Sequence, residues 1–156
     1  MRIGFDAKRA VSNNTGLGNY SRDTIRFLSH HFNNNEYFLY TAQGNKNARL
    51  SFINDSKNIL ICQPKSLFNK TFNTYWRSKD IVKDLSTQKI DIYHGLSNEL
   101  PIGIEKTTIK SVVTIHDLIF MRFPNLFNCI DRNIYYKKSK SACERANKII
   151  AISQQT

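Results

Sequence analysis

The stretch SVVTIHDL, residues 111–118, is an apolar run rich in β-branched side chains, and it ends close to a histidine-aspartate pair. This composition favours a β-strand. A second run of the same type, DIYHGL at 91–96, also carries a histidine near its end. We therefore predict two strands that end at His94-Gly95 and His116-Asp117.

Strand-like and helix-like patterns alternate over the rest of the chain. Short apolar runs predict further strands at 2–7, 36–42, 58–64 and 148–153. Apolar residues that recur at three-to-four spacing predict helices over 16–32, from Trp76 to about residue 88, and over 128–147. This alternation is typical of an α/β fold, and we expect a Rossmann-like, mostly parallel sheet with helices on both faces.

Three local expectations accompany this assignment. The stretch 65–74 reads as a loop. The basic helix 128–147 should place Ile130, Ile134, Ala142 and Ala146 on one side. Strand 148–153 reads as buried, and the chain ends three residues after it. We therefore interpret residues 1–156 as a single domain, and we expect a second, C-terminal domain to lie outside this chain.

The composition limits the classes of partner and the cellular location that we expect. Lys and Arg number 23 against 12 Asp and Glu, a net charge of +11. Such a balance favours anionic partners, namely nucleic acid, phosphorylated ligands or acidic lipid headgroups, or it simply keeps the surface soluble. No signal peptide or membrane-length apolar run is readable, and Cys62, Cys129 and Cys143 are widely separated, as reduced thiols would be. We expect a cytoplasmic protein.

Gly16 and Gly18 open the predicted helix 16–32, with Thr15 or Asn14 as its cap. A glycine loop that meets a helix start is a natural anion site, because it offers free N–H groups and a positive dipole end. The dinucleotide-binding fingerprint is incomplete, because Ser21 stands at the place of its third glycine. Phosphate binding and a plain helix-entry turn both remain open on the residues alone.

The histidines at the strand ends allow two readings as well. In an open parallel sheet, ligands gather beyond the carboxyl ends of the strands, where His94 and His116 are expected. Either histidine could instead be a structural residue with satisfied hydrogen bonds. Asp117 should face away from His116 and brace the following turn, so the pair is not expected to chelate a metal together.

Taken together, DAKRA, TGLGNYSR, DIYHGLSNELP, SVVTIHDLIFMRFP and RANKIIAIS resemble the N-terminal half of a GT-B glycosyltransferase of the retaining group-one or family-four type, which includes many mannosyltransferases. The similarity covers essentially the whole chain, and the order and spacing of the segments carry it. Such enzymes consist of two Rossmann-like domains that face each other across a cleft. The resemblance implies that this domain receives the acceptor and that a C-terminal domain grips the nucleotide-sugar.

The resemblance also assigns roles to residues. It implies that His116 is catalytic and reaches the transferred sugar, and that Gly16, Leu17 and Gly18 lie beside the donor phosphates and the acceptor. Many relatives carry Arg where this chain has Asn19, and the strand ends add two further binding candidates, His94 and Asp117. The resemblance implies no metal and no cofactor beyond a UDP or GDP sugar as donor.

The donor-binding Glu-x7-Glu pattern does not occur in the sequence, so the isolated chain is expected to be inactive. The acceptor would be a glycan or a lipid-linked molecule of surface polysaccharide synthesis, and helix 128–147 could meet the inner face of the membrane. The alternative is a non-catalytic Rossmann-like subunit that pairs with a separate donor-binding chain. A nucleic-acid binder is disfavoured, because the sequence has no recognition helix, zinc finger or interleaved aromatic-basic pattern.

Overall fold

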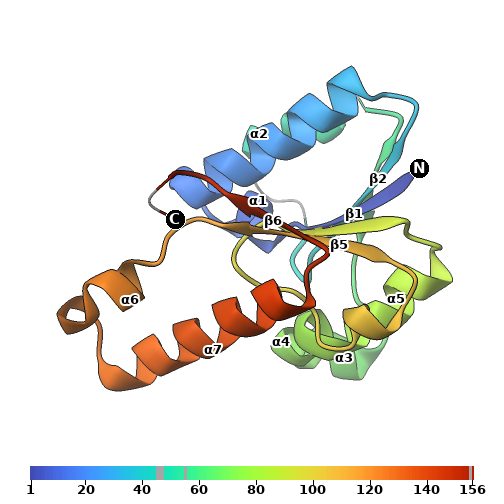
Figure 1. The fold of residues 1–156 in the computed structure, drawn as a ribbon. Coiled ribbons are helices and arrows are strands. Elements are labelled where there is room, and N and C mark those ends of the chain that lie inside the picture. Colours follow the sequence, from blue (N-terminus) through green and yellow to red (C-terminus); the bar gives the residue numbers. More distant parts are fainter. Residues whose placement is uncertain (45–47, 55, 155) are drawn as a thin grey trace.

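The computed structural model describes residues 1–44, 48–54, 56–154 and 156. A six-stranded parallel sheet lies between two layers of helices (Figure 1). Its strands are β1 (Arg2–Asp6), β2 (Glu36–Tyr40), β3 (Ile59–Cys62), β4 (Ile92–Gly95), β5 (Lys110–Ile115) and β6 (Lys148–Ala151). Each predicted strand is therefore present, with somewhat shorter bounds.

Helices of different length connect the strands. The α-helices are α1 (Lys8–Ser12), α2 (Gly16–His31), α3 (Leu67–Thr71), α4 (Asn73–Tyr75), α5 (Ile81–Thr87), α6 (Ile119–Arg122) and α7 (Cys129–Arg145). Four further turns are η1 (Ala48–Ile53), the π-helical η2 (Trp76–Asp80), η3 (Ile104–Lys106) and η4 (Pro124–Leu126).

The strand order β3-β2-β1-β4-β5-β6 confirms the Rossmann-like α/β prediction. Every neighbouring pair is parallel, so the sheet is more regular than the mostly parallel one expected. The chain winds outward from β1 to β3 and then returns to β4 on the other side of β1. The direction of winding thus reverses between β1 and β4, and ligands of such sheets bind in the crevice at that reversal.

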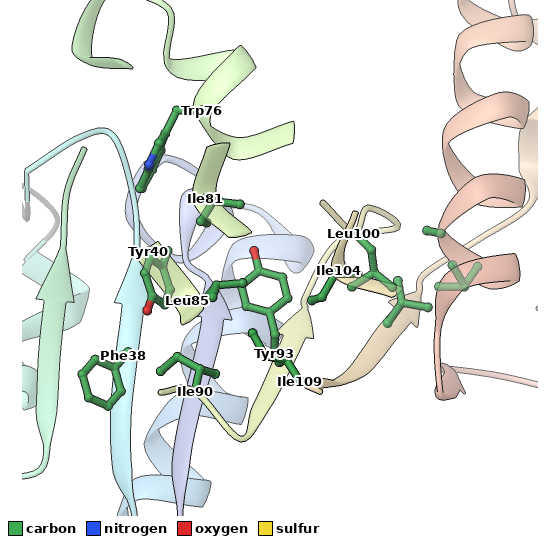
Figure 2. Close-up of a cluster of buried hydrophobic side chains, with 13 residues drawn as sticks. Phe38, Tyr40, Trp76, Ile81, Leu85, Ile90, Tyr93, Leu100, Ile104 and Ile109 are labelled. Carbon is green, nitrogen blue, oxygen red and sulfur yellow. The ribbon is translucent and has the colours of Figure 1, made fainter. Parts of the chain in front are cut away.

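Strand β2 shows how one sequence supplies two cores. Tyr37 and Leu39 point to the face covered by α1 and α2, where they join Phe5 and Ile25. Their neighbours on β2 point the other way, because successive side chains of a strand alternate. Figure 2 shows this second core, in which Trp76 and Ile81 lie above Tyr40 and Tyr93, Leu85 lies between the two tyrosines, and Leu100 and Ile104 lie alongside.

The prediction of a loop at 65–74 is wrong. Ser66 caps a short helix there, because its Oγ accepts a hydrogen bond from the backbone N–H of Asn69 at 3.1 Å. Helix α3 and then α4 follow. Their apolar side chains, Leu67 and Phe68 among them, stay exposed, so the segment has no buried face whose period could reveal a helix.

Two burial expectations are also wrong. In α7, Ile130 is 74% and Ile134 43% exposed, because the first half of the helix projects beyond the sheet together with α6 (Figure 1). Ala142, by contrast, is fully buried against the sheet. Strand β6 lies at the edge of the sheet, and all four of its residues are exposed. A search of the described residues found no helix with the length and apolar character needed to cross a membrane.

Candidate functional site

The carboxyl ends of β1, β4 and β5 bring several polar side chains to one edge of the sheet. Asp6 is the last residue of β1, and His116 directly follows β5. Glu99 lies in the connection after β4. Two cavities open at this edge, and the residues around them form the candidate site.

Asp6 and Arg77 form a buried ion pair between β1 and η2. Nη2 of Arg77 donates to Oδ2 of Asp6 at 2.6 Å, and Nε donates to Oδ1 at 3.3 Å. Their side chains are 6% and 11% exposed. Burial by itself would lower the pKa of Arg77, but the carboxylates of Asp6 and Glu99 raise it overall. The guanidinium is therefore a fixed positive charge beside the cavities.

Glu99 extends this pair into a network. One carboxylate oxygen of Glu99 lies 3.4 Å from Nη2 of Arg77, and the other accepts from Nζ of Lys138 at 2.9 Å. Lys8 lies nearby, and its pKa is lowered by burial and by the positive charges of Arg77 and Arg9. Burial is the first of these causes, and the carboxylates of Glu99 and Asp6 oppose it.

Cavity A, of about 400 Å3, lies between β4, η2 and the second half of α7. Its lining combines charged groups, hydroxyls and apolar side chains: Asp6, Thr74, Arg77, Ser78, Tyr93, Glu99, Leu100, Pro101, Ile102, Lys137, Lys138, Ser141 and Arg145. Glycine is required at the end of β4 beside it, since a Cβ on Gly95 would lie 2.0 Å from the carbonyl oxygen of Glu99. Because position 95 has no side chain, the loop that contains Glu99 and Leu100 can lie against the end of β4 and line the cavity.

Cavity B, of about 300 Å3, lies between the start of α2 and the α6–α7 projection. It is lined by Arg9, Leu17, Asn98, Glu99, Asp117, Ile119, Phe120, Phe127, Tyr135, Lys138 and Ser139. Leu17 belongs to the glycine loop and Asp117 to the His-Asp pair. The fold therefore brings one residue of each predicted motif to the same cavity, although about a hundred positions separate them.

His116 is held from three directions. Its Nε2 lies 2.8 Å from the carbonyl oxygen of Leu96, and its backbone N–H donates to Oδ1 of Asn98 at 2.9 Å. The ring of Tyr20 packs edge-on against it, with 4.9 Å between the ring centroids. Because a carbonyl can only accept, Nε2 carries a proton. In the neutral ring, Nδ1 then keeps a lone pair and acts as an acceptor.

His94 lies below this site in the sheet and lines neither cavity. Its Nε2 lies 2.8 Å from Oγ1 of Thr114, which in turn lies 3.1 Å from the hydroxyl of Tyr20. Burial, and then the neighbouring His116, lower the pKa of His94 to about 4. The ring is therefore neutral at physiological pH and links β4 to β5 and α2.

At the start of α2 the backbone N–H groups are bonded by the side chain of Asn13. Thr15 is the N-cap residue, but its side chain makes no capping bond. Oδ1 of Asn13 instead accepts from the backbone N–H groups of Thr15 at 2.8 Å and of Gly18 at 3.3 Å. The loop is pressed against the helix so closely that a Cβ on Gly18 would lie 1.8 Å from the Asn13 carbonyl oxygen. A glycine at position 18 is therefore required for the loop to pack against α2, whereas a Cβ on Gly16 would meet open space.

Asn19 is engaged inside the protein. Its Oδ1 accepts from Nη2 of Arg22 at 2.7 Å and also lies 3.5 Å from Nη1 of Arg49. Nη1 of the buried Arg22 donates to the carbonyl oxygens of Ala10 and Asn13. Burial lowers the pKa of this guanidinium, followed by the charge of Arg49. Arg22 thus fixes the loop that precedes α2.

Asp117 braces the turn after β5, as expected, because its Oδ1 accepts from the backbone N–H of Ile119 at 3.2 Å. The assignment of Gly16, Leu17, Gly18, Asn19, His94 and Asp117 to substrate binding, and of His116 to catalysis, stays a prediction. Of these seven, Leu17 and Asp117 line cavity B. His116 is buried and lines neither cavity, but its backbone N–H contacts Asn98, which lines cavity B. The side chains of His94 and Asn19 form hydrogen bonds with those of Thr114 and Arg22, respectively.

Sequence reasoning missed the Asp6–Arg77–Glu99–Lys138 network. Asp6 carried a signal, since it is a carboxylate at the end of a predicted strand. Arg77 carried none, because it meets Asp6 across 71 positions. Within the described residues there is no group of three or more His, Cys, Asp or Glu side chains placed to hold a metal ion. Cys62, Cys129 and Cys143 are free thiols.

Comparisons of this chain with protein-family models, with curated proteins and with solved structures gave no match.

Proposed function

We propose that this domain is the acceptor-binding, N-terminal part of a retaining glycosyltransferase, which moves a sugar from a UDP or GDP donor to a glycan or lipid-linked acceptor. One observation carries the proposal. Leu17 of the glycine loop and Asp117 of the His-Asp pair line one cavity at the carboxyl edge of a Rossmann-like sheet. That edge is where such sheets bind ligands.

The side chains around cavity B suit the positioning of a sugar hydroxyl. With Nε2 bonded to the carbonyl oxygen of Leu96, Nδ1 of His116 is the ring atom that would accept a hydrogen bond from a hydroxyl of the transferred sugar. Arg9 and Lys138 line the cavity as well, together with the carboxylates of Glu99 and Asp117. In a retaining reaction by front-face attack, the leaving phosphate would help to deprotonate the acceptor hydroxyl. The protein would contribute orientation and charge stabilisation.

The donor-binding body would sit against the carboxyl edge. The α6–α7 projection there exposes Met121, Phe123, Leu126 and Ile130, a surface that a second body could cover. This surface equally favours a second candidate function, a non-catalytic subunit that pairs with a separate donor-binding chain. In either case residues 1–156 alone would transfer no sugar. Both candidate functions are compatible with a cytoplasmic location at the inner face of the membrane, which we propose as well.

The test is a transfer assay on the polypeptide encoded by the complete reading frame, and on residues 1–156 alone. Each would be given a panel of UDP and GDP sugars with glycan and lipid-linked acceptors, and the anomeric configuration of the product would be read by NMR. We expect transfer with retention by the longer polypeptide and none by residues 1–156. An inverted product, or no transfer from any of these donors, would refute the proposal. If the frame stops at Thr156 and activity needs a second chain, the subunit reading is correct.

A further inference from the structure

Cavity A is distinct from the cavity that holds the predicted motif residues, and no sequence motif pointed to it. It shares Glu99 and Lys138 with cavity B, so the two cavities meet at that ion pair. A molecule whose hydroxyl occupies cavity B could therefore extend into cavity A.

Positive side chains outnumber carboxylates in the lining of cavity A. Arg77, Lys137, Lys138 and Arg145 face two carboxylates, those of Asp6 and Glu99. Outside the lining, Glu105 lies 3.6 Å from Nε of Arg145. That Nε is buried and makes no hydrogen bond with any described residue. The charge of Arg145 is therefore compensated only loosely.

Two cationic groups remain available to a ligand. Nη1 of Arg77 makes no hydrogen bond within the described residues, because Nε and Nη2 make the contacts to Asp6 and Glu99. The exposed Lys137 has no ion-pair partner in the described parts of the chain. An arginine and a lysine that converge on one cavity suit a phosphate, which offers several oxygens and a full negative charge.

The rest of the lining is apolar or carries hydroxyls. Leu100, Pro101, the exposed Ile102 and the ring of Tyr93 are the apolar part of the lining. Thr74, Ser78 and Ser141 add hydroxyl groups. Those of Thr74 and Ser78 already donate within the protein, and that of Ser141 accepts from Arg145. A bare inorganic anion would leave the apolar wall uncovered, whereas an apolar substituent would bury it.

We infer that cavity A binds the phosphate of an ester whose neighbouring substituent is apolar. This inference rests on the proposed function in one respect, since it identifies that ester as the acceptor. A lipid-linked phosphate carries such an apolar substituent, whereas a small soluble ester such as glycerol phosphate does not. The two differ in the group attached to the phosphate, so a comparison of esters separates them.

The test is titration calorimetry on the 1–156 chain with hexyl phosphate, glycerol phosphate and inorganic phosphate. Hexyl phosphate should bind best, and its affinity should fall as salt is raised, since the pairing is electrostatic. The Lys137→Gln variant should bind it about tenfold more weakly, the loss expected for one charged hydrogen bond. Lys137→Arg should restore the affinity. The matched control Lys110→Gln, which removes a lysine at the opposite edge of the sheet, should change nothing.

Several results would overturn the inference: no binding, equal affinity for all three phosphates, tighter binding of glycerol phosphate, or an unchanged affinity in Lys137→Gln. Because Lys137 is exposed on α7, its replacement leaves the core intact. Calorimetry also needs no sugar transfer. Binding of hexyl phosphate without any transfer activity in the complete polypeptide would therefore refute the proposed function and leave the phosphate site standing.

Discussion

Nζ of Lys138 and Oε1 of Glu99 lie 2.9 Å apart, and this ion pair forms part of the lining of both cavities at the carboxyl edge of the sheet. The pair is half exposed, whereas the Asp6–Arg77 pair to which Glu99 connects is buried. The network therefore contains a strong ion pair, Asp6–Arg77, and a weak one, Glu99–Lys138, and the two differ in strength because only the first is buried.

Arg77→Met should lower the free energy of unfolding by about 3–5 kcal/mol, because it leaves the buried carboxylate of Asp6 without its partner. Lys138→Met, in the exposed part of the network, should cost less than about 1 kcal/mol. Urea unfolding measures both. The double variant Asp6→Asn/Arg77→Met should be more stable than Arg77→Met alone. A single variant Arg77→Met as stable as Lys138→Met would contradict this account of the network.

Acid should destabilise the protein through His94. Its pKa falls from 6.5 to about 4 on folding, so the unfolded chain binds a proton at a pH where the native protein does not. Above pH 6.5 His94 is neutral in both states and does not reduce the free energy of unfolding. As the pH falls from 6.5 to about 4, the free energy of unfolding decreases by about 3 kcal/mol, because only the unfolded chain takes up the proton. Urea unfolding at a series of pH values would show the slope. His94→Gln should have a flatter slope over that range, and an equal slope in both proteins would count against the assignment.

Two glycines of one loop should respond differently to the same change. Gly18→Ala should destabilise the protein by about 2 kcal/mol or more, because the new methyl group would overlap the backbone of Asn13. Gly16→Ala is the matched control, since its methyl group would enter open space, and it should change the stability by less than about 1 kcal/mol. Thermal unfolding of both variants measures the difference. An equal loss of stability in Gly16→Ala and Gly18→Ala would show that Gly18 is not constrained by the backbone of Asn13.

Arg22→Met should cost about 1–3 kcal/mol, because the carbonyl groups of Ala10 and Asn13 would lose their buried donor. Arg26, one turn later on α2, makes an exposed pair with Asp23. Arg26→Met should therefore stay within about 0.5 kcal/mol of the parent protein. Urea unfolding compares the two, and similar losses would mean that Arg22 does not anchor the loop.

The sequence was sufficient to predict the α/β class and the positions of the strands, because β-branched runs such as 111–118 sit in a buried parallel sheet and carry a strong local signal. It also placed His116 and Asp117 correctly at a strand end. The strand order had no local signal, since it depends on contacts between distant segments. The face of α7 was misassigned because Ile130 and Ile134 follow a helical period without anything packed against them. In the candidate site, Arg77 reaches Asp6 only through the fold, so no spacing could reveal the pair or cavity A.

The proposed glycosyltransferase requires that the glycine loop and His116 serve one site of sugar transfer. The most direct measurement compares kcat for sugar transfer by the complete polypeptide with that of its His116→Ala variant, with Lys110→Gln as the control for a change away from the site. We expect kcat to fall by about a hundredfold or more in His116→Ala, the loss seen when a positioned polar contact at the reacting centre is removed, and to stay unchanged in the control. A folded His116→Ala variant that transfers sugar at the parental rate would contradict the claim.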